Sequence, residues 1–243
     1  NTSVPGSFQV TDYNGGGTLT YSYTFVGDPG TGSGAWVTSD RALHLHQDAN
    51  GTLTVIATDG TTTYTQAFDL VTGGDSTTDA IDFSLSTGPT IGDGLGKADV
   101  LTGSNNVDYL IGGTGGDTLI GNGGADVLFG GAGNDTFQYN AVSDSTPTAF
   151  DTILDFTASG GDADQIDFSP IAGITTVGLL NLTSVPTTID AHAIIAVQPG
   201  DGNTYVYANA GGVGETTSTG PDVMEIKLTG LVALNAADFL HAA

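Results

Sequence analysis

Five aspartates recur at nine-residue intervals near the middle of the chain, and their spacing is the strongest chemical signal in the sequence. They belong to five consecutive nonapeptides that run from Gly94 to Gln138: GLGKADVLT, GSNNVDYLI, GGTGGDTLI, GNGGADVLF and GGAGNDTFQ. Each unit begins with glycine, has aspartate at its sixth position and has a large apolar residue at its eighth. The aspartates are Asp99, Asp108, Asp117, Asp126 and Asp135, and the apolar residues are Leu101, Leu110, Leu119, Leu128 and Phe137. Carboxylates in such a regular array indicate cation binding.

Each nonapeptide predicts a tight turn followed by a short strand. A start such as GGTGGD disfavours a helix, because glycine loses much backbone entropy there and readily adopts positive φ. In a three-residue strand such as TLI, the central side chain faces inward and its neighbours face outward. Two units complete one coil, so aspartates two units apart stack at the strand spacing of about 4.8 Å. The predicted pairs are Asp99 with Asp117, Asp108 with Asp126, and Asp117 with Asp135.

Stacked carboxylates need a compensating cation. Two unit charges about 5 Å apart repel by roughly 3 kcal/mol at an effective dielectric constant near 20. Carboxylate and carbonyl oxygens are hard ligands, and a flexible site made from them suits Ca²⁺ better than Mg²⁺ or Zn²⁺. We therefore expect the array to be unfolded without calcium and folded with it. The alternative, a glycine-rich linker, gives no reason for an apolar residue every nine positions.

The nonapeptides resemble the repeats-in-toxin (RTX) family of bacterial proteins, which leave the cell by type I secretion. The resemblance implies a parallel β-roll with calcium between its turns, bound by aspartates and turn carbonyls. It also implies a chain that stays unfolded in the calcium-poor cytosol and folds outside. Turn glycines of the third to fifth units join the aspartates as implied metal-site residues: Gly112, Gly113, Gly115, Gly121, Gly124, Gly130, Gly131 and Gly133.

The first two units depart from the family pattern. Leu95 and Lys97 in the first unit, and Ser104, Asn105 and Asn106 in the second, stand where glycines are usual. These departures predict a weakened first calcium site and leave the strength of the second open.

Composition limits the class of protein. A length of 243 residues allows one large or two modest domains, and the net charge of −24 repels nucleic acid and anionic membranes while attracting divalent cations. The chain has no cysteine, no apolar run of the roughly 20 residues that span a bilayer, and no basic, apolar leader. It starts at Asn1 rather than at methionine, as expected of a processed product or of the C-terminal part of a longer polypeptide. These features predict a secreted bacterial protein at the cell surface.

The first 90 residues contain short β-type runs separated by turn residues. Asn50-Gly51 and Asp59-Gly60 are hairpin signals, and Leu53, Val55 and Ala57 alternate as in a half-buried strand. The pattern resembles immunoglobulin-like modules. We predict an all-β protein with three domains: a β-sandwich-like domain at 1–90, the roll at 91–138 and a β-rich capping region at 139–243.

Two groups in residues 1–90 allow a functional or a structural interpretation. His44 and His46 lie on the same side of a predicted strand and could begin a zinc site, although exposed strand histidines are commoner. Trp36, with Tyr21 and Tyr23, could form a sugar-binding platform or simply supply core and edge aromatics.

Two segments after the array extend the resemblance to secreted proteases of the serralysin type. They are Phe150-Asp-Thr-Ile-Leu-Asp-Phe156 and Gly160-Gly-Asp-Ala-Asp-Gln-Ile-Asp-Phe-Ser169. In that family the corresponding segment caps the last coil and contributes carboxylates to additional calcium. The resemblance implies four further calcium ligands: Asp151, Asp155, Asp164 and Asp167. The alternative is that these carboxylates are solvated while the apolar residues between them form a strand core.

The end of the chain resembles the C-terminal signal of type I secretion. An acidic residue precedes apolar ones in Asp238, Phe239 and Leu240. The alternative is an ordinary terminal helix packed on the sheet.

The chain lacks the common catalytic motifs. It has no His-Glu-x-x-His, no Gly-x-Ser-x-Gly, and Gly96-Lys97 is followed by alanine rather than by the serine or threonine of a phosphate loop. We therefore predict a non-enzymatic, calcium-dependent structural or adhesive protein of a surface layer, matrix or adhesin. Its predicted partners are calcium, the type I secretion apparatus, and either further copies of the chain or cell-surface polysaccharide. The alternatives are the C-terminal region of a secreted hydrolase and a carbohydrate-binding module at 1–90.

Overall fold

The fold is all-β, as the sequence predicts. The computed structural model describes residues 2–3, 20–28, 36–37, 43–45, 50–58, 63–73, 78–158, 162–178 and 180–242. Within these residues the regular elements are strands and two short 3₁₀ helices, η1 (Val142–Asp144) and η2 (Ala236–Asp238). None of the described helices is long and apolar enough to cross a membrane.

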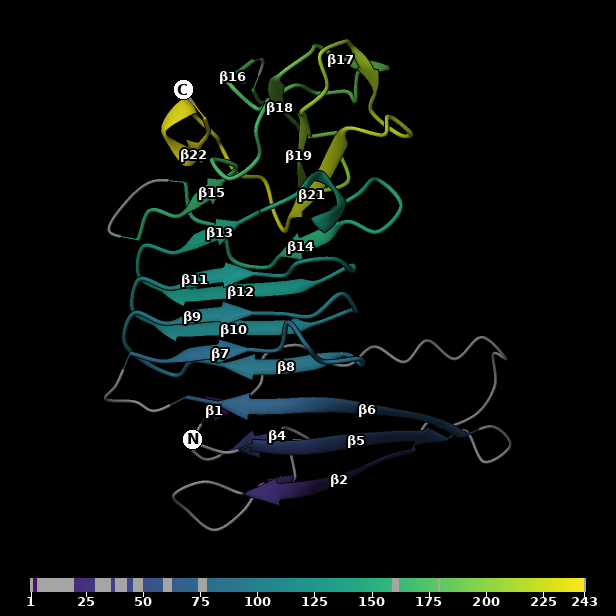
Figure 1. The fold of residues 1–243 in the computed structure, drawn as a ribbon, viewed down its shortest axis with the longest axis vertical. Helices are drawn as coiled ribbons and strands as arrows, with labels where there is room; N and C mark the ends of the chain where they lie inside the picture. Colours follow the sequence, from purple (N-terminus) through teal and green to yellow (C-terminus); the bar gives the residue numbers. More distant parts are fainter. Residues whose placement is uncertain are drawn as a thin grey trace.

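Two sheets, whose strands are parallel within the roll, stack along the long axis of the molecule (Figure 1). In the described residues one sheet has six strands in the order β22-β15-β13-β11-β9-β7. The chain passes from one sheet to the other after each short strand. The six strands are β7 (Ala80–Asp82), β9 (Val100–Thr102), β11 (Thr118–Ile120), β13 (Thr136–Gln138), β15 (Gln165–Asp167) and β22 (Phe239–Leu240).

The other sheet is longer and runs past the roll at both ends. Its described strands follow the order β16-β18-β19-β21-β14-β12-β10-β8-β6-β5-β2. Its bounds are β2 (Thr20–Asp28), β5 (Asn50–Thr58), β6 (Thr63–Thr72), β8 (Thr90–Asp93), β10 (Tyr109–Thr114), β12 (Val127–Ala132), β14 (Asp151–Ile153), β16 (Thr176–Val177), β18 (Ala193–Val197), β19 (Thr204–Asn209) and β21 (Val223–Leu228). The smaller pairings join β1 (Thr2–Ser3), β4 (Leu43–Leu45) and β3 (Trp36–Val37), and β17 (Thr188–Ile189) with β20 (Glu215–Thr216).

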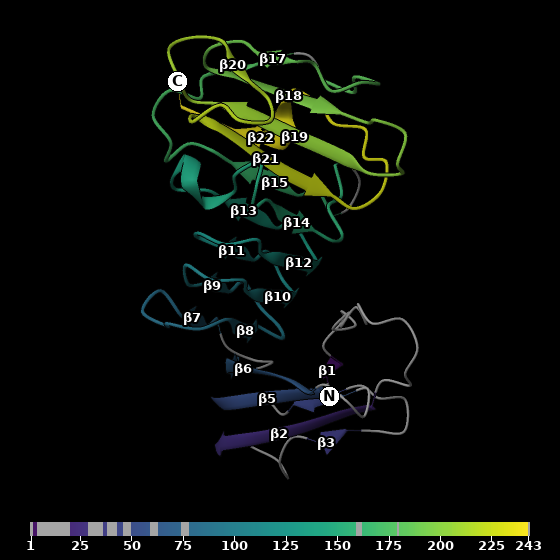
Figure 2. The same cartoon turned by 90° about the vertical axis from the view of Figure 1, so that its right-hand side faces the viewer.

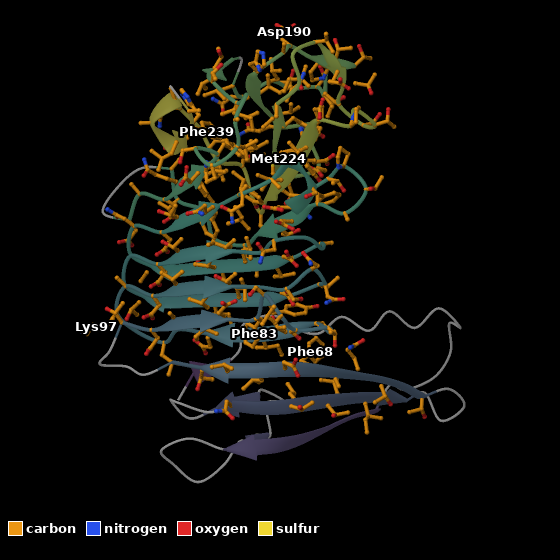
Figure 3. The ribbon with its side chains drawn as sticks, viewed as in Figure 1. Phe68, Phe83, Lys97, Asp190, Met224 and Phe239 are labelled. Carbon is orange, nitrogen blue, oxygen red and sulfur yellow. The ribbon has the colours of Figure 1, made fainter. Side chains whose placement is uncertain are left out.

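One apolar core fills the space between the two sheets. The five apolar residues at the eighth position of the nonapeptides are all buried, because the central side chain of each short strand faces inward. The same core continues in both directions, from Phe83 near one end to Met224 and Phe239 in the capping region (Figure 3). The roll and its cap therefore share a single hydrophobic interior.

At the N-terminal end the longer sheet continues beyond the roll without a break. β6 pairs in parallel with β8, and β5 and β2 extend the sheet in antiparallel register. β5 and β6, which flank the Asp59-Gly60 hairpin signal, pair in antiparallel register; the two signal residues themselves lie outside the described residues. The division into three domains stays a prediction, but hydrogen-bonded pairing crosses the predicted boundary near residue 90.

The hairpin turn predicted at Asn50-Gly51 is wrong. Both residues lie inside β5, where Asn50 is opposite Asp28 and Val71, and Gly51 is opposite Gly27 and Leu70. Pairing on both edges of the strand outweighs the local turn preference of the dipeptide.

At the C-terminal end two late strands add the last coil. β21 pairs in parallel with β14, and β22 pairs in parallel with β15, so segments far apart in sequence lie side by side (Figure 2). Phe239 is buried and stacks on Phe168 with ring centroids 6.4 Å apart. Asp238 ends η2 and precedes β22, so the segment matched to a secretion signal forms a 3₁₀ turn and an edge strand rather than a longer helix.

Candidate metal centre

The turns on the two sides of the roll carry two rows of stacked residues. The first row lies at the start of the strands of the six-stranded sheet, and the second row lies at the start of the roll strands of the longer sheet. The first row is Asp79, Asp99, Asp117, Asp135 and Asp164, and the second row is Thr90, Asp108, Asp126 and Asp151. All three aspartate pairs predicted from the sequence are neighbours in these rows.

Backbone hydrogen bonds connect each residue of a row to the next carboxylate. In the first row, Asp99 N–H donates to Asp117 Oδ1 at 2.8 Å and Asp117 N–H donates to Asp135 Oδ1 at 2.9 Å. In the second row, Asp108 N–H donates to Asp126 Oδ1 and Asp126 N–H donates to Asp151 Oδ1, both at 2.9 Å. One oxygen of each accepting carboxylate thus links two coils.

The second oxygen of most of these carboxylates has no donor. Five Oδ2 atoms in the described turns are buried without a hydrogen-bond partner, and they belong to Asp99, Asp117, Asp126, Asp135 and Asp151. The five residues are at most 1% exposed. A buried, unpaired carboxylate oxygen is costly unless a proton or a cation compensates it.

The first glycine of each unit lies beside the Oδ2 atom of that unit's aspartate. A methyl group at Gly112 would lie 2.5 Å from Asp117 Oδ2 and 2.5 Å from the carbonyl oxygen of Gly130. At Gly94 the corresponding distances are 2.6 Å to Asp99 Oδ2 and 2.6 Å to the carbonyl oxygen of Gly112. Carboxylate and carbonyl oxygens therefore border a space that any larger residue would fill.

Further carbonyl oxygens approach the turns from the neighbouring coil. A side chain at Gly115 would collide with the carbonyl of Lys97, and one at Gly133 would collide with the carbonyl of Gly115. Gly113, Gly124 and Gly131 likewise have positive φ and face a carbonyl of the preceding coil. Glycine is required there both for its backbone conformation and for close approach.

Burial raises the pKa values of seven row carboxyls. It raises the pKa of Asp117 to about 7, with Asp135 and Asp99 adding repulsion, and it raises the pKa of Asp164 to about 6. For Asp126 and Asp151 burial is again the largest cause, and repulsion between neighbouring carboxylates acts in the same direction. Burial likewise raises the pKa of Asp99, Asp108 and Asp135. Without a cation, the fold thus favours the protonated form of these groups.

Asp108 is the exception among the nonapeptide aspartates. Its Oδ2 accepts hydrogen bonds from Ser104 N–H at 2.5 Å and from Ser104 Oγ at 3.0 Å. Asn106 N–H in turn donates to Ser104 Oγ at 3.0 Å. The backbone N–H and the hydroxyl group of Ser104 therefore satisfy the oxygen that stays unpaired in the other units.

The four capping aspartates divide into row members and local caps. Asp151 and Asp164 extend the rows, although both oxygens of Asp164 accept backbone N–H groups, from Asp135 and from Thr157. Asp155 accepts from Gly130 N–H at 3.0 Å and Gly131 N–H at 2.7 Å, so it holds the last nonapeptide turn. Asp167 accepts from Ser169 N–H at 2.8 Å.

The donor set fits a hard cation. The described turns offer carboxylate and carbonyl oxygens, which suit Ca²⁺. No three acidic or histidine side chains of the described residues converge on one point, so backbone carbonyls would supply much of the coordination. The residues that would hold calcium are the row aspartates with unpaired oxygens and the turn glycines listed from the sequence.

The nonapeptide pattern does not predict the coils on either side of the array. Asp79 joins the first row 20 residues before Asp99, and Thr90 occupies an aspartate position in the second row. The sequence feature that could have indicated Asp79 is an aspartate directly before a short strand with an apolar centre, as in Asp79-Ala-Ile-Asp82. The side chains of His44, His46, Trp36, Tyr21 and Tyr23 lie outside the described part of the chain, so their predicted alternatives stay open.

Comparison with known proteins places this geometry in context. The family model "Peptidase M10 serralysin C terminal" matches residues 37–240. Among solved structures, the AlgE6R2 and AlgE6R3 subunits of the Azotobacter vinelandii mannuronan C5-epimerase are both 25% identical in sequence to this chain. The first match covers 70% of this chain and 91% of the subunit with a TM-score of 0.35, and the second covers 60% and 80% with a TM-score of 0.28. No curated protein matches the chain.

Proposed function

The chain belongs to the peptidase M10 serralysin C-terminal family, and from this premise we propose that it is a calcium-dependent structural or adhesive protein of the bacterial surface. Family members carry RTX-type, calcium-binding β-rolls and belong to secreted proteins. The proposed role is in a surface layer, a matrix or an adhesin, where calcium outside the cell drives folding and then assembly.

The main support for calcium binding is the set of five buried Oδ2 atoms in the two rows that have no hydrogen-bond donor. Divalent cations between the coils would compensate these charges and connect successive turns. The net charge of −24 acts in the same direction, because it attracts divalent cations and disfavours the compact state without them. The chain is proposed to be non-catalytic, since it lacks the catalytic motifs sought in its sequence.

Calcium-triggered assembly tests the structural role. The protein is unfolded in chelator, then returned to millimolar calcium while its mass is followed by light scattering and its β content by circular dichroism. Recovery of β structure together with particles larger than a monomer supports the proposal. A folded protein that stays strictly monomeric at millimolar calcium would exclude the assembling role while leaving calcium-coupled folding intact.

A second candidate is the folding and secretion region of a larger secreted hydrolase. The family match favours it, because the matched model describes the C-terminal part of a peptidase. Sequencing the complete gene decides between the two, since a catalytic domain encoded in the same reading frame would establish the second. A carbohydrate-binding role for residues 1–90 is tested by a glycan array, with Trp36→Ala as its control.

A further inference from the structure

A turn on the roll presents a leucine to solvent. Leu85 is 93% exposed, the highest value among the large hydrophobic residues of the described part of the chain. It follows Phe83, which is buried in the core, and it precedes Ser86, whose N–H donates to the carbonyl of Phe83 at 2.8 Å. Almost none of the Leu85 side chain is therefore buried within its own chain.

The turn that carries Leu85 is held by side-chain hydrogen bonds. Asp82 Oδ1 accepts from Ser84 N–H at 2.8 Å, which is the pattern of an Asx turn. Ser86 Oγ donates to Asp69 Oδ2 at 2.6 Å and so connects the turn to β6. Because Leu85 projects from a pre-organised backbone, a contact made through it loses little conformational entropy.

An apolar pocket of about 320 Å³ lies in the capping region. Its floor is the face of β18 that points away from the roll core, and neighbouring segments form its walls. A closed apolar cavity of about 150 Å³ holds a benzene ring, so this pocket has room for a leucine side chain. Six of its lining residues are apolar: Val177, Leu182, Pro186, Ile189, Ala193 and Ile195.

The pocket walls are fixed, and apolar surface continues beside them. Leu182 is held against β18, because its N–H donates to the carbonyl of Ala196 at 2.9 Å. Thr217 Oγ1 donates to the carbonyl of Pro186 at 2.7 Å. Val185, directly before Pro186, is 41% exposed. Exposed apolar surface around a pocket is typical of a protein contact or a ligand site.

The leucine and the pocket lie at different ends of the roll and cap. Asp190, which lines the pocket, lies at the C-terminal end of the molecule, whereas Phe83, in the turn of Leu85, lies toward the opposite end (Figure 3). An apolar side chain and a complementary pocket at two places on one chain can join it to a second copy. Such a heterologous contact leaves one free leucine and one free pocket, so further copies can add.

We propose that Leu85 of one copy inserts into the pocket beside β18 of the next copy and that this contact links copies into chains. The inference rests on the proposed function, for which it names the two surfaces that assemble. Asp190 lines the pocket, and Asp82 and Asp69 hold the turn of Leu85, so the contact brings like charges together. Cations screen this repulsion, and the contact is therefore favoured at millimolar calcium.

Light scattering of the full chain at millimolar calcium tests the contact. Leu85→Asp removes the leucine at an exposed position, and Ala193→Phe fills the pocket from its floor. We expect each change to raise the dissociation constant for assembly by about tenfold or more. Leu231→Asp, at another leucine that is 66% exposed, is the matched control and should assemble as the wild type does. Circular dichroism in calcium first establishes that each variant recovers its β content.

Mixing the two assembly variants tests the direction of the contact. The Ala193→Phe copy keeps its leucine, and the Leu85→Asp copy keeps its pocket. An equal mixture should therefore form dimers that do not grow, while each variant alone stays monomeric in sedimentation velocity. A mixture of folded variants that stays monomeric would overturn the contact.

The outcomes separate this inference from the proposed function. A folded wild type that stays monomeric contradicts both. A wild type that assembles, with Leu85→Asp assembling equally well, overturns the contact alone and leaves the pocket to a different ligand. Loss of assembly in both Leu85→Asp and Leu231→Asp also overturns it, because the added charge would then be a sufficient cause. If Ala193→Phe does not fold, the comparison of the two leucine variants still decides.

Discussion

Two turns of the second row, at 103–108 and 121–126, each lead into a roll strand of the longer sheet. They differ in which groups donate hydrogen bonds to their aspartate. In the earlier turn, Ser104 donates to Asp108 through both its N–H and its hydroxyl group. In the later turn, Asn122 Nδ2 donates to the carbonyl of Gly103 at 2.8 Å, and Asp126 Oδ2 has no partner. The earlier turn thus satisfies its carboxylate with its own donors, and the later turn leaves one carboxylate oxygen without a donor.

The two turns should differ most in how calcium affinity responds when Asp126 or Asp108 is replaced by asparagine. Asp126→Asn removes a charged ligand, so we expect calcium affinity at one site to fall by roughly a hundredfold. The calcium-free protein should become no less stable, because a buried, unpaired charge is lost. Isothermal titration and urea unfolding measure the two quantities.

Asp108→Asn is the matched variant, and we expect it to lower stability without changing calcium binding. An amide nitrogen in place of Asp108 Oδ2 cannot accept from Ser104, which costs about 1–3 kcal/mol of stability with or without calcium. The number of bound calcium ions should stay the same. Equal calcium stoichiometry and equal stability in the two variants would remove the distinction between the turns.

A glycine substitution probes the space beside the unpaired oxygen. A methyl group at Gly121 would collide with Asp126 Oδ2, whereas one at Gly123 meets nothing nearer than Asn105 Oδ1 at 3.5 Å. We expect Gly121→Ala to destabilise the calcium-loaded protein by about 1–3 kcal/mol, and Gly123→Ala to change it by less than about 1 kcal/mol. Thermal unfolding at fixed calcium compares them, and a Gly121→Ala protein as stable as wild type would show that the space has no role.

Exchanging the sequence of one turn for that of the other sharpens the comparison further. Ser104→Asn, Asn105→Gly and Asn106→Gly together give positions 103–106 the sequence of positions 121–124. The variant should bind one additional calcium ion and lose about 1 kcal/mol of calcium-free stability through the missing serine hydrogen bonds. Equilibrium dialysis counts the ions, and an unchanged count would mean that Ser104 and Asn106 do not exclude calcium.

Much of the roll can be predicted from the sequence because its units keep one spacing. Between Asp99 and Asp135 every aspartate and every inward apolar residue recurs at nine positions, and the structure places them in rows and core as expected. Within the array, neighbours in one row are 18 residues apart. Outside it the separation is 20 residues from Asp79 to Asp99, 25 from Asp126 to Asp151 and 29 from Asp135 to Asp164. Loops of variable length break the period while hydrogen-bonded stacking preserves the rows.

Other features depend on contacts that no local pattern reveals. β22 joins β15 across more than 70 residues of sequence, because the inward-facing Phe239 packs on Phe168. Asn50-Gly51 looks like a turn and lies in a strand, since it pairs on both edges. In the sequence Ser104 departs from the repeat, and only the structure shows that its N–H and hydroxyl group donate to the carboxylate of Asp108.

A separate prediction is a pH dependence of the calcium-free protein. The pKa of Asp117 is about 7 in the fold and near 3.8 in an unfolded chain, so the folded state binds an extra proton between these values. This contribution to stability is fully present below the unfolded value and is lost as the pH rises through about 7. In chelator at acidic pH, where protonated row carboxyls favour the fold without calcium, urea unfolding should show stability falling by about 1 kcal/mol per pH unit from this group, and Asp117→Asn should flatten the slope.

Backbone hydrogen exchange with and without calcium tests the central claim most directly. If calcium completes the two rows, amides of residues 94–138 should exchange slowly at millimolar calcium and at unprotected rates in excess chelator at neutral pH. The turn at 103–108 should lose protection together with its neighbours, because its own hydrogen bonds cannot hold a coil whose partners have opened. Equal protection of 94–138 in calcium and in chelator would contradict the account.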